Sequence, residues 1–415
     1  MLAVNEYYLR VAIDHHKPGR LPFEIDGTGI RACLQPSKAY RMTLETHQGN
    51  TGDIDVERAL SIARRRVWNL VTQHPGQVPV YTHAGRWQFD GDSWAPIWTG
   101  GFLAGMMWIF AERTGKPEWR EQAEKYSRIV EPRKLDNGTH DIGFLFTPSW
   151  SRWHAADPSD QTRAVLIQAG RTMAGRFNAA GRYLRTWVSP GSTFIDVMMN
   201  IGIIYQAAQL SGDAALADIA TAHALTSRRF LVRGDASTVH EGWFDPDSGE
   251  FLRAATHQGY RSDSSWVRGH AWAIYGFGTA YLWTHDERFV DTARRCADLY
   301  IEQVGADFIG PNDWSDPSPE FRYEASGASI TASAMLQLAE LLGDAGVAYR
   351  DYARGILARL SSAEFLGTDD DGWEGILRHS LYHRGEGIGV DESVMWGDYY
   401  FVEALDRLSK ASAAQ

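Results

Sequence analysis

Cysteine is nearly absent from this chain of 415 residues, which contains only Cys33 and Cys296. Two cysteines are too few for a disulfide framework, and their scarcity is typical of a reducing compartment. A hydrophobic export signal is also missing, because Glu6, Arg10 and Asp14 interrupt the first residues. We therefore expect a cytoplasmic protein whose thiols take no part in its chemistry.

Long hydrophobic runs and an excess of positive charge are missing too. The longest apolar run, near residues 102–111, is about half of the roughly 20 residues that span a bilayer. The formal net charge is −11, whereas nucleic acids and anionic membrane surfaces attract a cationic face. We expect neither a nucleic acid nor a membrane as a partner. Only 6 of the 41 basic residues are lysines, so few side chains could form a Schiff base.

The sequence has no fixed repeat period, yet one pattern recurs in it. An uncharged stretch rich in Gly, Ala and Ser meets a short polar turn, and a charged amphipathic segment follows; the turns cover residues 114–119, 211–216, 284–289 and 342–349. Helices that are apolar all round are buried, so alternate helices form an inner and an outer layer. This predicts an all-α fold, an α/α barrel. A helical solenoid is the alternative, but solenoids usually keep a fixed period.

Signals for β-strands are weak. Residues 242–253, GWFDPDSGEFLR, and the end of the loop at 305–328 are candidates for short hairpins on the rim of the barrel. No Pro- or Ser-rich linker and no sharp change of composition divides the chain. The sequence therefore predicts one domain over residues 1–415.

Tryptophan is abundant, with 16 residues. Several stand with His, Asp and Arg in the loops that lead into the uncharged helices, at residues 94–102, 139–146, 185–200, 263–272 and 394–401. In a barrel these loops converge at one end of the central cavity, where we expect the site. Flat apolar faces beside hydrogen-bonding groups suit sugar rings, so we expect a carbohydrate ligand. The alternative is that Trp98, Trp108, Trp272 and Trp283 only pack the core.

Two aspartates in these loops are candidates for catalysis. Asp196 stands in apolar company at the expected start of a buried helix, and Asp141, in HDIGF, is the expected second carboxylate. A helix start favours the anion, whereas burial and a neighbouring carboxylate favour the neutral acid, so Asp196 could act as a general acid. The alternatives are a helix cap for Asp196 and a turn residue for Asp141. A carboxylate pair at a sugar site suggests glycoside hydrolysis, but the sequence does not give their distance.

Metal-binding patterns are weak. His379 and His383 are four residues apart, a spacing that could ligate a metal on a helix, but no acidic third ligand stands beside them. The segment at 369–372 resembles the start of a calcium loop, yet Ser380 occupies the twelfth position instead of glutamate. We predict no metal and no cofactor.

Five segments resemble, in the same order, the motifs of the unsaturated glucuronyl hydrolases of glycoside hydrolase family 88. They are WTGGFLAGMMW (98–108), HDIGFLF (140–146), FIDVMMN (194–200), SSWVRGHAWAIYG (264–276) and WGDYY (396–400). The resemblance covers about residues 60–405. It implies an (α/α)6 barrel of the six-hairpin glycosidase type, with short β decorations in the rim loops and catalytic aspartates at Asp141 and Asp196.

The resemblance also implies a reaction, the hydration of a vinyl ether at the non-reducing end of oligosaccharides left by polysaccharide lyases. Asp196 protonates C4 of the C4=C5 double bond of the uronic acid, and water adds at C5. The hemiketal then opens and releases the remaining sugar. Trp187 matches the family's stacking tryptophan and His240 a histidine of its pocket, while Trp266 and Arg268 of SSWVRGHAW are expected to bind substrate.

Two departures from the family's pattern affect the expected site. His270 replaces the usual glutamine, which implies a titratable ring near the reacting water and adds His270 to the expected substrate-binding residues. His257, Glu386 and Ile388 stand where glycosaminoglycan-specific members have an arginine and a SxSxK stretch. Recognition of sulfate by that route is therefore not expected.

Three alternatives stay open. An unsaturated rhamnogalacturonyl hydrolase shares the barrel and the reaction, and sugar epimerases or ordinary glycosidases share the barrel alone. A non-catalytic sugar-binding barrel is less favoured, because this chain keeps both aspartates. The sequence predicts neither the parent polysaccharide nor the oligomeric state.

Overall fold

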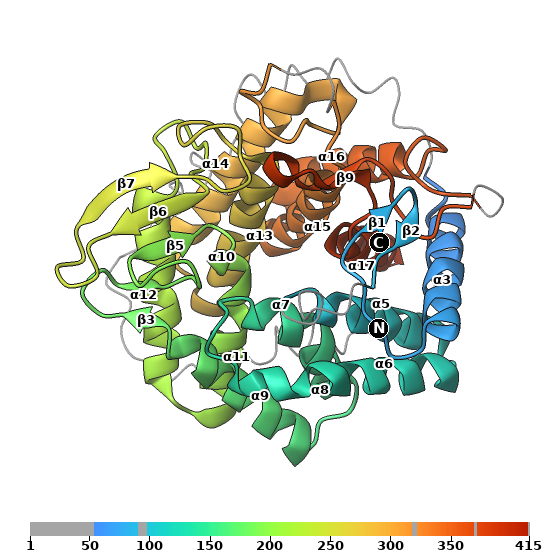
Figure 1. Ribbon diagram of the computed structural model, residues 1–415, viewed down its shortest axis with the longest axis horizontal. Coiled ribbons are helices and arrows are strands. Elements are labelled where there is room, and N and C mark those ends of the chain that lie inside the picture. Colours follow the sequence, from blue (N-terminus) through green and yellow to red (C-terminus); the bar gives the residue numbers. More distant parts are fainter. Residues whose placement is uncertain (1–53, 90–97, 318–321, 369–371, 414–415) are drawn as a thin grey trace, which may run out of the picture.

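The computed structural model describes residues 54–89, 98–317, 322–368 and 372–413, in which six inner and six outer helical segments form two layers (Figure 1). The inner layer consists of α5 (Gly100–Thr114), α7 (Ile142–Phe146) with α8 (Arg152–Ala156), α10 (Val197–Asn200) with α11 (Gly202–Ser211), α13 (Val267–Thr284), α15 (Ala325–Leu342) and α17 (Met395–Ala413). The outer layer consists of α3 (Val56–Gln73), α6 (Pro117–Val130), α9 (Asp160–Ala174), α12 (Ala214–Phe230), α14 (Glu287–Val304) and α16 (Val347–Leu360).

The inner layer closes into a ring. Helix α7 packs against α5 and α10, α13 packs against α10 and α15, and α17 packs against both α15 and α5. Glycines allow the close approach: a Cβ added at Gly101 would lie 2.3 Å from the carbonyl oxygen of Leu145, and one at Gly276 would lie 2.5 Å from Cβ of Met198. The predicted α/α barrel is confirmed, and its rim elements face the viewer in Figure 1.

The four predicted turns are confirmed, and three of them end an inner helix in the same way. Gly115, Gly212 and His285 adopt the left-handed conformation with φ of 65°, 75° and 52°. Asp213 and Asp286 follow at once and cap α12 and α14, because each side chain accepts the backbone N–H two residues further on. The sequences SGD and THD therefore end one helix and begin the next.

Burial separates the two layers as the composition predicts. Every residue of α15 from Ala325 to Leu338 is buried, whereas α14 buries only one face. That face includes Cys296, which is a free thiol; Cys33 lies outside the described residues. No helix in the described ranges is long and apolar enough to cross a bilayer.

A buried polar network around Glu403 of α17 fills part of the barrel interior. Its carboxylate accepts hydrogen bonds from Tyr399, from Tyr275 of α13 and from Ser333 of α15, at 2.8, 3.1 and 2.6 Å. Arg152 of α8 forms an ion pair with it at 2.9 Å. A buried charge is tolerated only with such partners, so this network joins four inner helices.

Short strands decorate the rim. The strands β5 (Ser192–Phe194), β6 (Glu241–Phe244) and β7 (Phe251–Ala255) form an antiparallel sheet, in which β6 and β7 are the predicted hairpin. Three further two-stranded pairs are β1 (Thr82–His83) with β2 (Arg86–Trp87), β3 (Phe177–Asn178) with β4 (Tyr183–Leu184), and β8 (Ser380–His383) with β9 (Ile388–Glu392).

The hairpin predicted at the end of the 305–328 loop is wrong for the residues described there. Glu324 caps α15 by accepting the backbone N–H groups of Ser326 and Gly327, so the chain enters a helix at Ala325. Upstream, Asp313 forms only an isolated bridge with Trp266.

Candidate active site

Asp141 and Asp196 precede two inner helices that pack against each other. Each aspartate occupies the N-cap position of its helix, as the alternative for Asp196 held, but neither side chain makes a capping hydrogen bond there. The helices α7 and α10 touch at Gly143, where an added Cβ would lie 2.4 Å from Cα of Asn200. Asn200 also accepts the N–H of Phe144 at 2.8 Å and donates to the carbonyl of Asp196 at 3.1 Å. These contacts hold the two aspartates at one end of the barrel.

The carboxyl group of Asp196 is poorly solvated and poorly paired. Its side chain is 16% exposed, and Oδ1 has no hydrogen-bond partner among the described residues. Burial, followed by the charge of Asp141, raises the pKa of Asp196 to about 7, while Arg268 and His257 oppose the rise. At neutral pH the group is therefore divided between acid and carboxylate, as a combined general acid and base requires.

Asp141 is held by its neighbours in the chain. The hydroxyl of Thr139 donates to Oδ2 at 2.7 Å and accepts the backbone N–H of Asp141 at 3.1 Å. Nε2 of His140 lies 3.5 Å from Oδ1, but burial lowers the pKa of His140 although the charge of Asp141 opposes this. A neutral His140 leaves the charge of Asp141 free to act on Asp196.

His240 faces Asp196 in a defined tautomer. Its Nδ1 accepts the backbone N–H of His257 at 3.2 Å and lies 3.1 Å from the hydroxyl of Thr256. A ring nitrogen that accepts a hydrogen bond carries no proton, so the proton of the neutral ring is on Nε2, 3.9 Å from Oδ1 of Asp196. Burial holds the pKa of His240 well below its usual range. The ring therefore presents an N–H donor, unpartnered within the described residues, toward the carboxyl.

Trp266 and Arg268 lie beside His240. The indole of Trp266 lies 4.5 Å from the imidazole of His240, and the guanidinium of Arg268 lies 4.4 Å from the centre of the indole. Arg268 is buried and donates to two backbone carbonyls of β8 and to Oε1 of Gln258. It therefore supplies a fixed positive charge close to Asp196.

Trp187 and His270 differ from the other predicted site residues. Trp187 lies on the loop between β4 and β5 and is 60% exposed, which leaves its indole face open to a ligand. His270 is fully buried: its Nε2 lies 2.7 Å from the carbonyl oxygen of Cys296 on α14, its ring packs on Trp314, and burial lowers its pKa to about 4. These contacts place His270 in the core between α13 and α14 and do not bring it to the aspartates.

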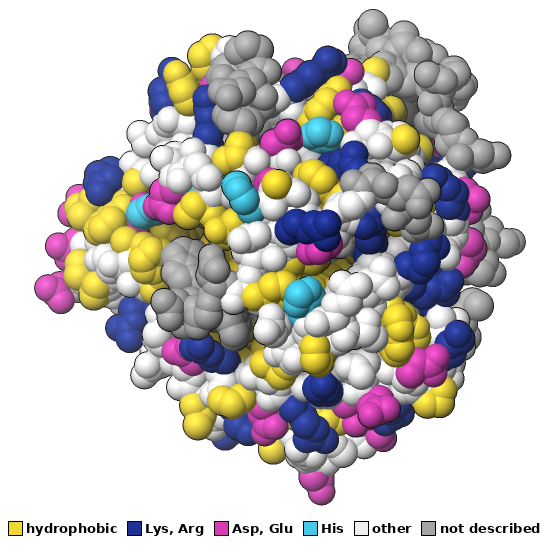
Figure 2. Space-filling model, turned by 45° about the vertical axis from the view of Figure 1, so that its right-hand side comes forward, with side chains coloured by type: hydrophobic (Ala, Val, Ile, Leu, Met, Phe, Trp, Pro, Cys, Tyr) yellow, Lys and Arg dark blue, Asp and Glu magenta, His cyan; other side chains and the backbone are white. Residues whose placement is uncertain are grey.

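Aromatic side chains form a wall at this end of the barrel. Trp98 packs 4.6 Å from Trp396 and 5.8 Å from Phe144, and Tyr382 packs 4.9 Å from Trp396. Trp98 is partly exposed, whereas Trp108 and Trp272 are buried and pack the core, as the alternative interpretation held. Figure 2 shows hydrophobic side chains gathered around a hollow near the middle of the face it views.

A further ion pair at this end was not predicted. Nε2 of His257 lies 3.1 Å from Oε2 of Glu241, and this hydrogen bond raises the pKa of His257. Glu241 directly follows the predicted His240 and begins β6, but its burial, with 1% exposure, is known only from the structure. Gln258 and Tyr382 were missed because β7 and β8 bring them to the site only through tertiary contacts.

His379 and His383 do not share a ligand. His379 precedes β8 and pairs with Asp391 at 2.6 Å, whereas Nε2 of His383 lies 3.9 Å from Glu386. Across the described ranges, no group of three or more His, Cys, Asp or Glu side chains could hold a metal. Residues 369–371 of the calcium-loop pattern lie outside the described residues.

Known proteins resemble this chain over most of its length. The sequence model of the protein family Glycosyl Hydrolase Family 88 matches residues 64–288. An unsaturated glucuronyl hydrolase of Bacillus sp. (strain GL1) is 34% identical over 75% of this chain and 86% of its own length. An unsaturated chondroitin disaccharide hydrolase of Streptococcus pneumoniae is 29% identical over 75% of this chain and 82% of its own.

A solved structure shows the same likeness in three dimensions. The crystal structure of the unsaturated glucuronyl hydrolase from Bacillus sp. GL1 aligns with a TM-score of 0.81 at 30% identity, covering 86% of this chain and 97% of that one. The matched region contains Asp141, Asp196, His240 and Arg268. The chain therefore belongs to Glycosyl Hydrolase Family 88.

Proposed function

We propose that this protein releases a 4,5-unsaturated uronic acid from the non-reducing end of lyase-generated oligosaccharides, with Asp196 as general acid and base. One observation supports this assignment above the others. A carboxyl group with a pKa raised to about 7 presents an unpaired oxygen, within the described residues, at the aromatic end of a family 88 barrel. Such a carboxyl can donate a proton and accept one back near neutral pH.

The proposed reaction is a hydration. Asp196 donates its proton to C4 of the C4=C5 double bond, which leaves positive charge shared by C5 and the ring oxygen. The carboxylate of Asp196 then takes a proton from a water whose oxygen bonds to C5. One water is consumed, Asp196 ends protonated, and the resulting hemiketal opens to release the remaining sugar.

Two charges control the proton of Asp196 in this scheme. Asp141 raises its pKa and so favours the acid form that begins the reaction. Arg268 acts in the opposite direction and stabilises the carboxylate that forms after proton donation. We further propose that the oxygens of Asp141 accept hydrogen bonds from ring hydroxyls.

The substrate ring is proposed to lie between His240 and the exposed Trp187. Nε2–H of His240 is a donor without a partner in the described ranges, which suits an oxygen of the uronate. Trp187 offers an open face for stacking, and Trp266 packs against the ring of His240.

Loss of ultraviolet absorbance tests this proposal, because the substrate has a conjugated double bond and the product has none. The wild-type protein should consume a lyase-generated unsaturated disaccharide and leave the intact polysaccharide uncut. Asp196→Asn should lower kcat by about 10²–10⁴-fold, the usual contribution of a positioned acid or base. Circular dichroism should show an unchanged fold. Full turnover by Asp196→Asn would reject the role of Asp196.

The parent polysaccharide is a separate question. The relatives are named for glucuronyl and chondroitin disaccharide substrates, and an unsaturated rhamnogalacturonyl substrate is the alternative. A panel of unsaturated disaccharides, sulfated and unsulfated, decides among them by kcat/KM. The cytoplasmic location stays a prediction that rests on the low cysteine content.

A further inference from the structure

Glu241 is a buried carboxylate that the proposed reaction does not use. It lies on β6 opposite Phe194 of β5, two residues before Asp196. Its side chain accepts the hydroxyl of Ser192 at 2.5 Å and pairs with Nε2 of His257 at 3.1 Å. A carboxylate with 1% exposure is costly unless it is paired, so its position calls for an explanation.

The pKa values of Glu241 and His257 both shift in the direction that favours a charged pair. Burial favours the neutral acid, but the hydrogen bonds from His257 and Ser192 outweigh it and hold the pKa of Glu241 below its usual range. The same hydrogen bond raises the pKa of His257, and the charges of Asp196 and Glu386 act in the same direction. The imidazole of His257 is 41% exposed, so it borders the site, whereas its partner Glu241 is enclosed.

The turn that carries His257 organises the groups around Asp196. Backbone N–H groups of His257 and Gln258 point at Nδ1 of His240, at 3.2 and 3.4 Å, and impose the tautomer with Nε2–H toward Asp196. The side-chain oxygen of Gln258 accepts a hydrogen bond from Arg268. One short turn therefore contacts both the N–H donor and the fixed cation of the site.

We propose that Glu241 is a positioning residue: its ion pair with His257 fixes the turn at 256–258, and through it the tautomer of His240 and the cationic surroundings of Asp196. This role rests on the proposed function for its kinetic consequence. The pairing itself is a property of the folded chain and can be measured without turnover.

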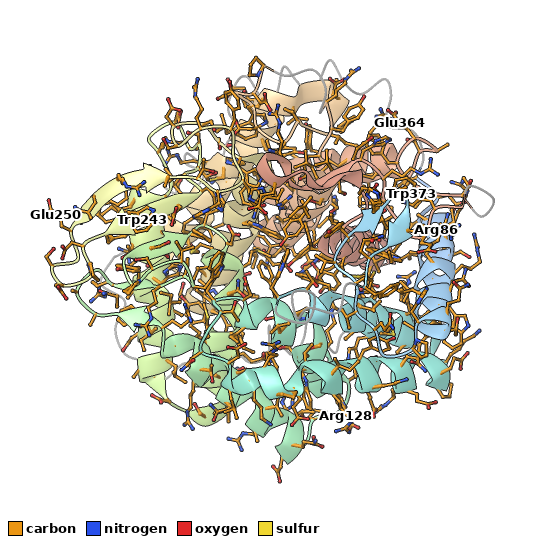
Figure 3. The ribbon with its side chains drawn as sticks, in the orientation of Figure 1. Arg86, Arg128, Trp243, Glu250, Glu364 and Trp373 are labelled. Atoms are coloured by element: carbon orange, nitrogen blue, oxygen red, sulfur yellow. The ribbon has the colours of Figure 1, made fainter. Side chains whose placement is uncertain are left out.

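The kinetic test compares Glu241→Gln with Glu250→Gln. Glu250 lies at the outer end of the same hairpin, and Figure 3 shows it at the edge of the molecule, beyond Trp243 of β6. We expect Glu241→Gln to lower kcat/KM by about 10- to 100-fold, as a misplaced site does. The alkaline limb of its pH profile, where kcat/KM falls as Asp196 loses its proton, should move to higher pH. The reason is that an uncharged His257 no longer lowers the pKa of Asp196. Glu250→Gln should match wild type in both respects.

A double-mutant cycle separates positioning from general destabilisation. If Glu241 acts through His257, then Glu241→Gln with His257→Gln should be about as slow as the slower single variant. His257→Arg, which keeps a cation beside Glu241, should retain the wild-type alkaline limb. The proposal is overturned if the fold loss of kcat/KM in the double variant equals the product of the losses in the two single variants. It is also overturned if Glu241→Gln behaves like Glu250→Gln.

Histidine NMR gives a readout that does not depend on activity. Titration of ¹⁵N-labelled protein, with the signal of His257 assigned by His257→Gln, should show its pKa falling by about one unit in Glu241→Gln. An unchanged pKa would overturn the pairing even in an inactive protein. Conversely, a wild-type protein that leaves the double bond intact would refute the proposed function, and the titration would still decide the pairing.

Discussion

The proton of Asp196 is subject to opposing influences that set the pH range of the reaction. Because burial and Asp141 raise its pKa to about 7, the acid form needed for the first step disappears above that pH. We expect kcat/KM to decline as pH rises through about 7 and to stay level just below it. A rate profile between pH 5 and 9 measures this limb.

Asp141→Asn is the matched variant for that profile. It removes the neighbouring negative charge that raises the pKa of Asp196, so the alkaline limb should move to lower pH. The variant will also have a lower maximal kcat/KM. The pH at which kcat/KM falls does not depend on that maximum. A limb that stays in place would mean that Asp141 does not govern the proton of Asp196.

The same raised pKa predicts a cost in stability. An aspartate in the unfolded chain has a pKa of about 3.9, so between that pH and about 7 the folded state holds a proton that the unfolded state has lost. Stability from this group is therefore present at low pH and lost as pH rises. Asp196→Asn cannot ionise and should have a higher free energy of unfolding at pH 8, by about 1–4 kcal/mol. Denaturant unfolding should show that the gain in free energy of unfolding of Asp196→Asn over wild type is clearly smaller at pH 5 than at pH 8.

Single residues were predictable where the local sequence was enough. Asp141 and Asp196 stood out because each is a carboxylate in apolar company next to a buried helix. His270 did not follow the expectation, because a motif position does not reveal which way a side chain points from a helix that is buried all round. The pair of Glu241 and His257 joins residues that only the β6–β7 pairing brings together.

Among the secondary-structure elements, the contact between α7 and α10 holds the site together. Gly143→Ala would place a Cβ 2.4 Å from Cα of Asn200, so the two helices must separate and carry Asp141 and Asp196 apart. We expect kcat/KM to fall by about 10- to 100-fold and the free energy of unfolding to fall by about 1–3 kcal/mol. Steady-state kinetics and denaturant unfolding measure the two effects.

Gly202→Ala is the control for that substitution. A Cβ there would lie 3.4 Å from Cγ2 of Thr279, which is ordinary contact, and alanine favours a helix. This variant should keep both activity and stability. If both glycine variants behaved alike, the loss in Gly143→Ala would come from glycine replacement in general and not from the helix contact.

Helices and turns were more predictable than strands. Three of the four turns contain a left-handed residue, followed in two cases by a capping aspartate. The strands β8 and β9 have no such signal and pair across a short loop at 384–387. The end of the loop before α15 was wrongly predicted as a hairpin. Glu324 caps α15 instead, and that role depends on where this inner helix begins.

The whole barrel depends on the network around Glu403, which is far along α17 from the aspartate loops. Glu403→Gln removes the carboxylate that pairs with Arg152 at 2.9 Å, whereas Arg407 keeps its pair with Glu340, and an unpaired buried charge costs about 3–5 kcal/mol. We expect the free energy of unfolding to fall by that amount, with kcat/KM little changed at temperatures where the variant stays folded. Glu302→Gln, on an exposed position of α14, is the control. Equal stability of the two variants would contradict a role for the network in joining the inner helices.

The alternation of uncharged and amphipathic helices, the turns between them and the two aspartates were all determined by the sequence, because each depends on residues that are neighbours along the chain. Ring closure, the tautomer of His240, the burial of His270 and the pairing of Glu241 with His257 were decided only by the tertiary structure. Each of these requires side chains from separate helices and strands to meet in a buried space. In that space, distances between groups and their desolvation determine which groups carry a proton. No local sequence pattern records either quantity.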